Sequence, residues 1–290
     1  MCQVISCPII RHHDLTIAPI GERKEQYVLS IVVTVKQVHD PEAPASTFKI
    51  DPETERVVLA PGIPPVLNPY DENALEAALR IKDANHCRVT VISLGAKLAK
   101  AVHRKCLAAG ADDLFLLEDE LFRDLDSYCT AFVLAIAIRR IGQWDLILTG
   151  RLAADTTAGV VGSGIAEMMQ IPSVTVAGRI EIAGDGMRVE RVVADGCELV
   201  EVPLPALVTV SHELGELRNV SLQELMAAQD KPITTWRCQD LGIESLPMRR
   251  VSPLKLFIPH KETSCEIVEG ASEAKAGTKL ALKLRDAKLI

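Results

Sequence analysis

Apolar runs alternate with helical segments between residues 30 and 150, and this alternation constrains the fold more than any other feature. Residues 30–35 (SIVVTV) are a continuous β-branched run of the kind found in strands that are buried on both faces. Strand patterns follow at 88–94, 114–117 and 145–149, and a segment with helical periodicity separates each pattern from the next. This order predicts an α/β fold with an open, mainly parallel sheet and helices on both faces.

The first helix has a clear beginning in the sequence Asn-Pro-Tyr-Asp at residues 68–71. We expect the side chain of Asn68 to cap the helix and Pro69 to occupy its first position. Asp71 would then interact favourably with the positive end of the helix dipole. Two later helices are predicted over residues 101–108 and 127–141.

The pattern changes beyond Pro172, where short strand candidates are separated by Gly-Asp turns. These candidates predict an antiparallel meander. The segment 206–210 is expected to return to the main sheet, and a weaker helical pattern follows it at 222–228. The predicted meander strands are 174–182, 187–193 and 197–202.

The two ends of the chain have less regular patterns than the middle. Residues 1–29 are predicted to form an N-terminal extension, and residues 30–235 the α/β domain. Residues 236–290 are punctuated by prolines and contain one modest amphipathic candidate at 279–285, so we expect an arm that lies on another surface. A flexible tail is the alternative, but it would leave several apolar residues exposed to water.

The eight cysteines are scattered and form no CxxC pair, so the sequence indicates neither a disulfide scaffold nor a zinc knuckle. Most are expected to be buried thiols. Four potential metal ligands lie close together near the N-terminus, but their spacing fits none of the common zinc patterns, and no metal site is predicted. These four residues are Cys2, Cys7, His12 and His13.

The formal charge of −7 indicates an acidic surface, which repels nucleic-acid backbones and anionic lipids. Aromatic residues make up only 3% of the chain, too few for the stacking platforms of single-strand binders. No apolar run reaches the roughly 18 residues of a membrane helix, and the first residues lack the features of a secretion signal. We therefore expect a cytoplasmic protein that binds no nucleic acid and inserts into no membrane.

Several strand ends offer places for a ligand, because ligands of open parallel sheets collect at the carboxyl ends of the strands. The richest is the small-residue loop 150–164, which leads into a helix. Thr156 and Thr157 are placed to donate hydroxyls to a phosphate, and Asp155 either to cap the helix or to accept from a ribose hydroxyl. A tight turn without a ligand is the alternative. The other strand ends are Val35-Lys36-Gln37, Ser93-Leu94-Gly95 and the region after Leu117.

The sequence contains none of the common phosphate-binding or catalytic motifs. Gly162-Ser163-Gly164 lacks the third glycine of a dinucleotide fingerprint, and there is no GxxxxGK[ST], GxSxG or HExxH. His212 follows the strand at 206–210 and is a candidate for acid–base catalysis, but most histidines are expected to be ordinary surface residues. These histidines are His39, His86, His103, His212 and His260.

Several segments together resemble the β subunit of electron transfer flavoprotein, a carrier that passes electrons from flavin dehydrogenases to a downstream acceptor. The resemblance extends from about Ile31 to the C-terminus, and so many segments in one order make it specific. In chain order they are VTVKQV, KIDPETERVV, NPYDENALEAALRIKD, VTVISLG, CLAAGADDLFLLED, DLILTGRLAAD, VPLPALVTV and ELGELRNVSLQELM.

The resemblance implies an adenine-nucleotide-binding, Rossmann-like fold and an α subunit that holds the redox-active FAD near the subunit interface. The present chain would hold either a structural AMP or a second FAD. Transferred position by position, the nucleotide contacts would be Thr34, Asn68, Pro69, Tyr70, Asp71, Leu94, Leu152, Ala153, Ala154, Asp155, Thr156, Thr157, Ala158, Gly159, Val160, Val161, Gly162 and Ser163.

The choice between the two nucleotides separates two kinds of carrier. Family members with a second FAD split the electron pairs of NADH between two acceptors, and KIDPET and NPYDENALEAAL resemble those members. The nucleotide loop favours AMP, because the family commonly has a second acidic residue, a glutamine and a polar residue at Thr157, Val160 and Ala158. AMP is therefore the preferred prediction and a second FAD the alternative.

Two further residues have roles implied by the resemblance. Tyr70 would face the flavin of the α subunit, or be a half-buried aromatic at a helix start. Leu214 matches a leucine that anchors the carrier to dehydrogenases, which predicts an exposed apolar side chain. The basic run that typically follows in the family is Ala227-Ala228-Gln229-Asp230-Lys231 in this chain.

The preferred functional hypothesis is a non-catalytic β subunit of a heterodimeric carrier that accepts electrons from flavin dehydrogenases of the acyl-CoA type. Its C-terminal arm, residues 236–290, would pack on the α subunit. An electron-bifurcating, NADH-oxidising carrier is the alternative within the family. A nucleotide-sensing stress-type protein is the alternative from another class, and it predicts a stable homodimer. An adenylating enzyme would need a glycine-rich pyrophosphate loop, which residues 36–41 do not provide.

Overall fold

The chain folds around one large sheet, as the computed structural model shows for residues 3–5, 28–51, 53, 56–58, 62–258 and 265–290. The chain divides into two units. One comprises Met1–Lys49 and Val57–Leu254, and the other comprises Ile50–Arg56 and Lys255–Ile290. The sheet belongs to the first unit.

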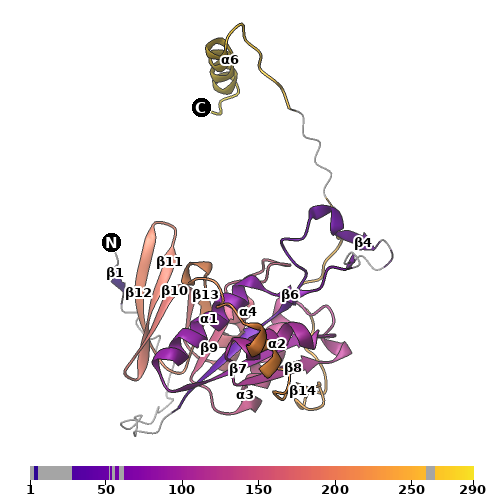
Figure 1. Cartoon of the computed structure of the whole chain (residues 1–290), viewed down its shortest axis with the longest axis vertical. Coiled ribbons are helices and arrows are strands. Elements are labelled where there is room, and N and C mark those ends of the chain that lie inside the picture. The colour runs from indigo at the N-terminus through magenta and orange to yellow at the C-terminus, as the bar shows by residue number, and fades with distance from the viewer. Residues whose placement is uncertain (1–2, 6–27, 52, 54–55, 59–61, 259–264) are drawn as a thin grey trace. The chain divides into compact units, whose positions relative to one another are not determined.

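The sheet has ten strands in the order β1-β12-β11-β10-β13-β9-β2-β7-β8-β14. Parallel pairing runs without interruption from β10 to β14, which confirms the predicted open α/β fold (Figure 1). The strands are β1 (Gln3–Ile5), β2 (Leu29–Val35), β7 (Cys87–Gly95), β8 (Asp113–Glu118), β9 (Leu146–Gly150), β10 (Ser173–Ala183), β11 (Gly186–Val193), β12 (Gly196–Pro203), β13 (Ala206–Val210) and β14 (Thr234–Trp236).

Helices connect the parallel strands, and the predicted helices are confirmed. Two small two-stranded sheets lie outside the main sheet: β3 (Gln37–Val38) with β6 (Val66–Leu67), and β4 (Lys49–Asp51) with β5 (Arg56–Val58). The helices are α1 (Pro69–Ala84), α2 (Lys100–Ala109), α3 (Ser127–Ile141), α4 (Val161–Met169), α5 (Leu222–Ala227) and α6 (Glu273–Asp286), with short 3-10 turns η1 (Ala45–Thr47), η2 (Glu120–Phe122) and η3 (His212–Leu214).

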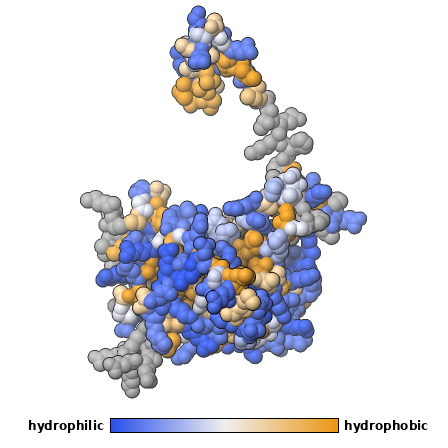
Figure 2. Space-filling model, viewed as in Figure 1, coloured by the Kyte–Doolittle hydropathy of each residue, from blue (hydrophilic) through white to orange (hydrophobic). Residues whose placement is uncertain are grey.

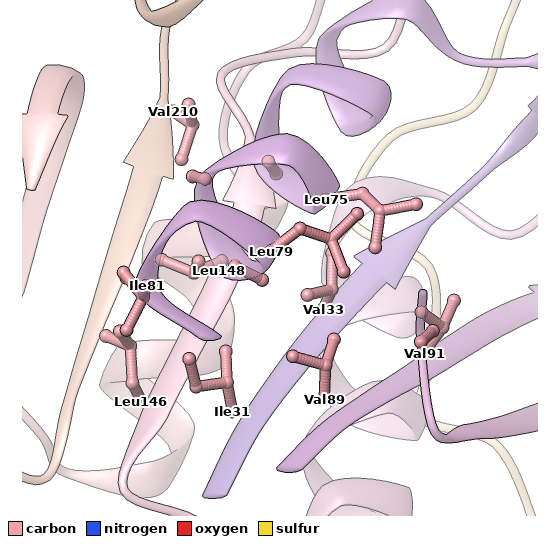
Figure 3. Close-up of a cluster of buried hydrophobic side chains, with 14 of the residues drawn as sticks. Ile31, Val33, Leu75, Leu79, Ile81, Val89, Val91, Leu146, Leu148 and Val210 are labelled. Carbon is pink, nitrogen blue, oxygen red and sulfur yellow. The ribbon is translucent and has the colours of Figure 1, made fainter. Parts of the chain in front are cut away.

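Alternate residues of the central strands face two separate apolar clusters, as the period of a strand requires. Ile31 and Val33 of β2 belong to the cluster that α1 and α2 cover, whereas Val32 belongs to the cluster under α3 and α4. Figure 3 shows Leu75 and Leu79 of α1 above the strands of the first cluster. The two-sided burial explains why these strands read as continuous apolar runs in the sequence.

The meander forms as predicted, and the N-terminal extension contributes to it. Strands β10, β11 and β12 pair antiparallel, and β13 returns to the sheet between β10 and β9. Residues 3–5 of the predicted extension form β1, which pairs in parallel with β12. The edge of a sheet offers unpaired backbone groups, and β1 covers this edge of β12 at Glu198, Leu199 and Val200.

The expected arm begins later than residue 236. Strand β14 pairs with β8, and the Trp236 ring lies 4.7 Å from that of Phe115. Cys238, Leu241 and Ile243 are buried in the α3 and α4 cluster. The predicted boundary is therefore too early, since the first unit extends to Leu254.

The second unit contains the predicted C-terminal amphipathic segment. Helix α6 spans 14 residues, rather than only the expected 279–285. Ser272 caps it by accepting a hydrogen bond from the backbone of Lys275, and none of its residues is buried.

Two kinds of feature are absent from the part of the chain that the structure describes. It contains no helix that is long and apolar enough to cross a membrane. It also contains no group of three or more His, Cys, Asp or Glu residues that could hold a metal ion. The four N-terminal residues Cys2, Cys7, His12 and His13 lie outside the described residues.

Candidate functional site

The candidate site lies at the carboxyl ends of β2, β7 and β9, three neighbouring strands. Thr34 of β2 lies between Ile92 of β7 and Thr149 of β9 in the strand register. Thr34 and Thr149 are both buried, and Leu94 of β7 is half-buried. The predicted residues Thr34 and Leu94 therefore end adjacent strands, next to the loop that follows β9.

Asp71, in the first turn of α1, joins two of these strand ends. Its Oδ2 accepts a hydrogen bond from the backbone N–H of Lys36 at 2.7 Å, and its Oδ1 accepts from Gly150 at 3.1 Å. A β-carbon on Gly150 would collide with the Asp71 carboxylate, so this approach requires glycine. Burial raises the pKa of Asp71 to about 7, against the opposing effect of its hydrogen bonds.

Asn68 holds the loop after β9 and does not cap α1 as predicted. Its side chain makes no capping hydrogen bond. Instead, Nδ2 donates to the carbonyl of Leu152 at 2.8 Å, and Oδ1 accepts from the N–H of Ala154 at 3.1 Å. Because a side-chain amide can both donate and accept, Asn68 forms hydrogen bonds with two backbone groups of the loop. Both groups would lose this partner if Asn68 capped the helix instead.

Asp155 pairs with Lys36 and does not cap α4, contrary to one of the two predicted roles. Lys36 Nζ lies 2.7 Å from Asp155 Oδ2 and 2.8 Å from its Oδ1. The N-cap of α4 is Val160, whose side chain cannot accept a hydrogen bond. The first N–H groups of α4 therefore have neither an intrahelical nor a side-chain acceptor, which suits an anionic ligand.

The middle of the loop is exposed and has an unusual backbone. Residues 155–160 are exposed, and Thr157 and Gly159 have φ values of 52° and 64°. A threonine in the left-handed region costs on the order of 1 kcal/mol or more, and such strain concentrates at ligand-binding sites. The Thr157 hydroxyl donates to the carbonyl of Thr156 at 2.8 Å, and the predicted contacts Ala158 and Val160 are both in this exposed stretch.

Small residues bring α4 close to the strands. A β-carbon on Gly162 would lie 2.6 Å from Thr149 Oγ1 and 2.8 Å from a methyl of Thr209, so a larger residue would push the helix away. Val161 and Ser163 flank Gly162 in the first turn and are half-buried. The predicted contacts Val161, Gly162 and Ser163 thus belong to a helix start that is fixed by packing.

Tyr70 lies under Arg151 at the rim of the site. The guanidinium carbon of Arg151 is 5.6 Å from the centre of the Tyr70 ring, within cation–π range. The backbone N–H of Arg151 donates to the carbonyl of Val210 at 3.0 Å, which ties the loop to β13. Tyr70 is half-buried and the neighbouring Pro69 is exposed.

Lys36 and Arg151 also lie at this candidate site, although neither is among the predicted nucleotide contacts. Both residues directly follow buried strands. The signal available in the sequence was a basic residue at the end of such a strand, beside a small-residue loop. Together with the free N–H groups of α4 and the loop hydroxyls, they form a donor set that can bind a phosphate. The arrangement can thus hold an anionic nucleotide and orient it against the sheet edge.

The segment that follows β13 is held on α1 by polar side chains. Asn73 donates to the carbonyl of Gly215, and Arg80 to that of Leu214, each at 2.7 Å. Glu76, with its side chain only 6% exposed, accepts hydrogen bonds from the backbone and side chain of Arg218. Burial would raise the pKa of Glu76, but the hydrogen bonds from Arg218 and Arg80 lower it below its usual value.

Leu214 is buried, so the expected exposure of its side chain is wrong. Leu214 is 8% exposed and belongs to the apolar cluster under α1. His212 is exposed and lies 3.3 Å from the carboxylate of Glu213. His103 is buried, and its two ring nitrogens are hydrogen-bonded to the Ala99 carbonyl and the Ser93 hydroxyl.

Comparison with known proteins decides the family. The model of the electron transfer flavoprotein domain matches residues 57–241, which is more than half of the chain. The chain belongs to the electron transfer flavoprotein family. This match includes α1, the loop after β9 and the segment after β13, whereas Thr34 and Lys36 of the site precede it.

Similar curated proteins identify the electron transfer flavoprotein subunit. Subunit CarD of the caffeyl-CoA reductase–Etf complex of Acetobacterium woodii is 36% identical over 267 residues, covering 90% of this chain and 100% of CarD. The electron transfer flavoprotein β subunit of Thermoanaerobacterium thermosaccharolyticum is 37% identical over 247 residues, covering 83% and 93%. Protein FixA of Azorhizobium caulinodans is 32% identical over 225 residues, covering 75% and 78%. The chain is a β subunit of the family, with a role in electron transfer.

Proposed function

We propose that this β subunit binds an adenine nucleotide at the loop after β9 and pairs with an α subunit that holds a redox-active FAD. The pair then passes electrons from flavin dehydrogenases to a downstream acceptor. The observation that supports nucleotide binding best is the attachment of the exposed loop to Asn68 and Lys36, beside the uncapped start of α4.

The residues present fit a nucleotide of this kind. The first N–H groups of α4 and Lys36 supply donors for the phosphate, and the Thr156 and Thr157 hydroxyls lie in the same exposed loop. The Asp155 carboxylate, already paired with Lys36, provides an acceptor for a ribose hydroxyl. FAD, when bound by the α subunit, supplies the electron chemistry, and the present residues hold and orient the nucleotide.

We propose AMP as this nucleotide and keep a second FAD as the alternative. AMP would stabilise the subunit, whereas a second FAD would add a redox centre and make the complex electron-bifurcating. The two differ in a directly measurable way, because FAD is yellow and fluorescent when it is released.

The cytoplasmic location remains a prediction from the sequence.

Asn68→Ala tests the proposed site. The variant loses both hydrogen bonds to the loop, and we expect it to bind AMP about tenfold more weakly, as the loss of one or two buried hydrogen bonds implies. Titration calorimetry with AMP, on αβ complex freed of bound nucleotide, measures the change. Unchanged affinity would contradict the proposed site.

Asn85→Ala is the matched control for this experiment. Asn85 lies at the opposite end of α1, where its side chain donates to the carbonyl of Ile81 at 2.9 Å. This substitution also removes a side-chain hydrogen bond of the helix, but far along the helix from the loop. We expect AMP affinity equal to that of the unmodified complex.

A stable homodimer without an α chain would instead support the nucleotide-sensing alternative.

A further inference from the structure

One edge of the main sheet is formed by β1, the short strand that pairs with the outer strand of the meander, β12 (Figure 1). On its inner side, β12 pairs with β11 over its whole length, from Gly196 to Pro203. On its outer side, β12 pairs with β1 only at Glu198, Leu199 and Val200. The outer N–H and C=O groups of a strand can bind another strand unless something covers them. Three residues of β1 therefore cover the middle of an edge that is eight residues long.

The rest of the β12 edge carries residues that discourage pairing. Glu201 and Pro203 are both exposed. A charge on an edge strand opposes the approach of another strand, and proline has no N–H to donate. By contrast, Leu199 and Val200 are apolar and half-buried, and Figure 2 shows hydrophilic and hydrophobic residues side by side over the meander. The part of the edge that β1 covers is thus the part that lacks such protection.

Two β12 edges without β1 can pair with each other about a twofold axis, because antiparallel strands present the same backbone pattern to one another. With the axis at Leu199, Glu198 of one copy lies opposite Val200 of the other, and Glu201 lies opposite Cys197. No carboxylate of these strands then lies directly opposite another, which would be destabilising. Glu198 is also paired with Arg191 of β11, at 2.9 Å. The uncovered edge therefore fits a second copy of this chain.

We propose that residues 198–200 of β12 form a strand-binding edge, and that β1 occupies it so that two copies of the chain do not pair through it. Strands added to a sheet edge bind mainly through main-chain hydrogen bonds. A second β12 would offer more of these bonds than the three residues of β1. However, β1 belongs to the same chain, so its pairing is intramolecular and its effective concentration is high. The inference does not depend on nucleotide binding.

Removal of residues 2–5 tests the proposal in the αβ complex. We expect sedimentation velocity to show that the shortened complex shifts, with rising concentration, from one αβ complex to a pair of complexes, whereas the full-length complex stays single. Hydrogen exchange gives a second measurement, at a concentration where the shortened complex is single. The backbone amides of 198–200 that β1 covers should then exchange about tenfold faster or more, because they have lost their partner strand.

Leu199→Lys in the shortened chain should restore single complexes, because it places two like charges opposite each other at the axis. Val192→Lys in the shortened chain is the matched control. Val192 is also half-buried, and it pairs with Cys197, two residues from Leu199, so it lies on the same face but not at the edge. We expect this control to keep the pairing.

Three results would overturn the proposal. The first is a shortened complex that stays single at every concentration, or whose amides at 198–200 exchange no faster. The second is pairing of the full-length complex, which would mean that β1 does not prevent it. The third is an equal effect of the two lysine substitutions, which would assign the contact to the face of the meander or to neither surface. If the chain does not bind an α subunit at all, the proposed function fails instead.

Discussion

Asp71 determines, at the scale of a single residue, how the first turn of α1 meets the sheet. Its carboxylate bonds the backbone of Lys36 and Gly150, one from each of two neighbouring strand ends. The helix-start pattern predicted an acidic residue at a helix N-terminus, and the family resemblance implied a nucleotide contact, but neither indicated these two backbone hydrogen bonds. The carboxylate also requires a glycine at position 150, because a β-carbon there would collide with it. This requirement arises from a contact between residues far apart in the chain.

Asp71→Asn should alter how stability depends on pH. Burial raises the pKa of Asp71 from 3.8 to about 7, so the protonated form favours folding below pH 3.8 and this contribution disappears as pH rises through 7. The stability of the variant relative to the native chain should therefore increase between about pH 4 and about pH 7, by at most about 4 kcal/mol, and then stay constant. Urea unfolding across this range measures it, and a difference independent of pH would contradict the assignment.

Asn68 and Leu214 show where residue-level prediction fails. An asparagine before a helix favours a cap, but its amide satisfies a loop equally well, and the sequence does not reveal which loop crosses it. Leu214 lies in a segment without periodicity, so its burial depends on the side chains of α1 that hold the segment. Such dependence on a distant element leaves no local pattern.

At the scale of one element, the polar side chains of α1 hold two different segments of the chain. Its N-terminal end holds the loop after β9, and its polar stripe, defined as Asn73, Glu76, Arg80 and Asp83, holds the segment after β13. The stripe follows helical spacing, with steps of three, four and three residues, and this was the signal in the sequence that could have revealed it.

Arg218→Met should destabilise the chain by about 3 kcal/mol, because it leaves the buried carboxylate of Glu76 with fewer partners. Arg188→Met is the matched control. Arg188 pairs with Glu201 in a pair that is more than half exposed, and its loss should cost less than about 1 kcal/mol. Urea unfolding of both variants makes the comparison. Equal losses would show that Glu76 does not depend on Arg218.

The helices and parallel strands were predictable because each contains enough periodic apolar residues to define its type. The predicted helix at 127–141 coincides with α3, and the strand at 206–210 with β13. Strand β14 was missed because Thr234, Thr235 and Trp236 are too few to show a period. Only pairing with β8 makes this segment a strand.

At the scale of the whole molecule, the sequence predicted the fold class but not the order of the strands. Alternating strands and helices require a parallel sheet, yet they do not reveal that β13 lies beside β9, between the central strands and the meander. That position matters for the site, because it brings Val210 to Arg151 and Thr209 to the start of α4.

The central claim is that this subunit binds a nucleotide of its own within an αβ complex. The most direct test is to purify the complex with its α subunit, denature it, and quantify the nucleotides released per heterodimer by chromatography. The account predicts one FAD together with one AMP, or two FAD if the β site holds the flavin. Release of one FAD and no further adenine nucleotide would contradict it.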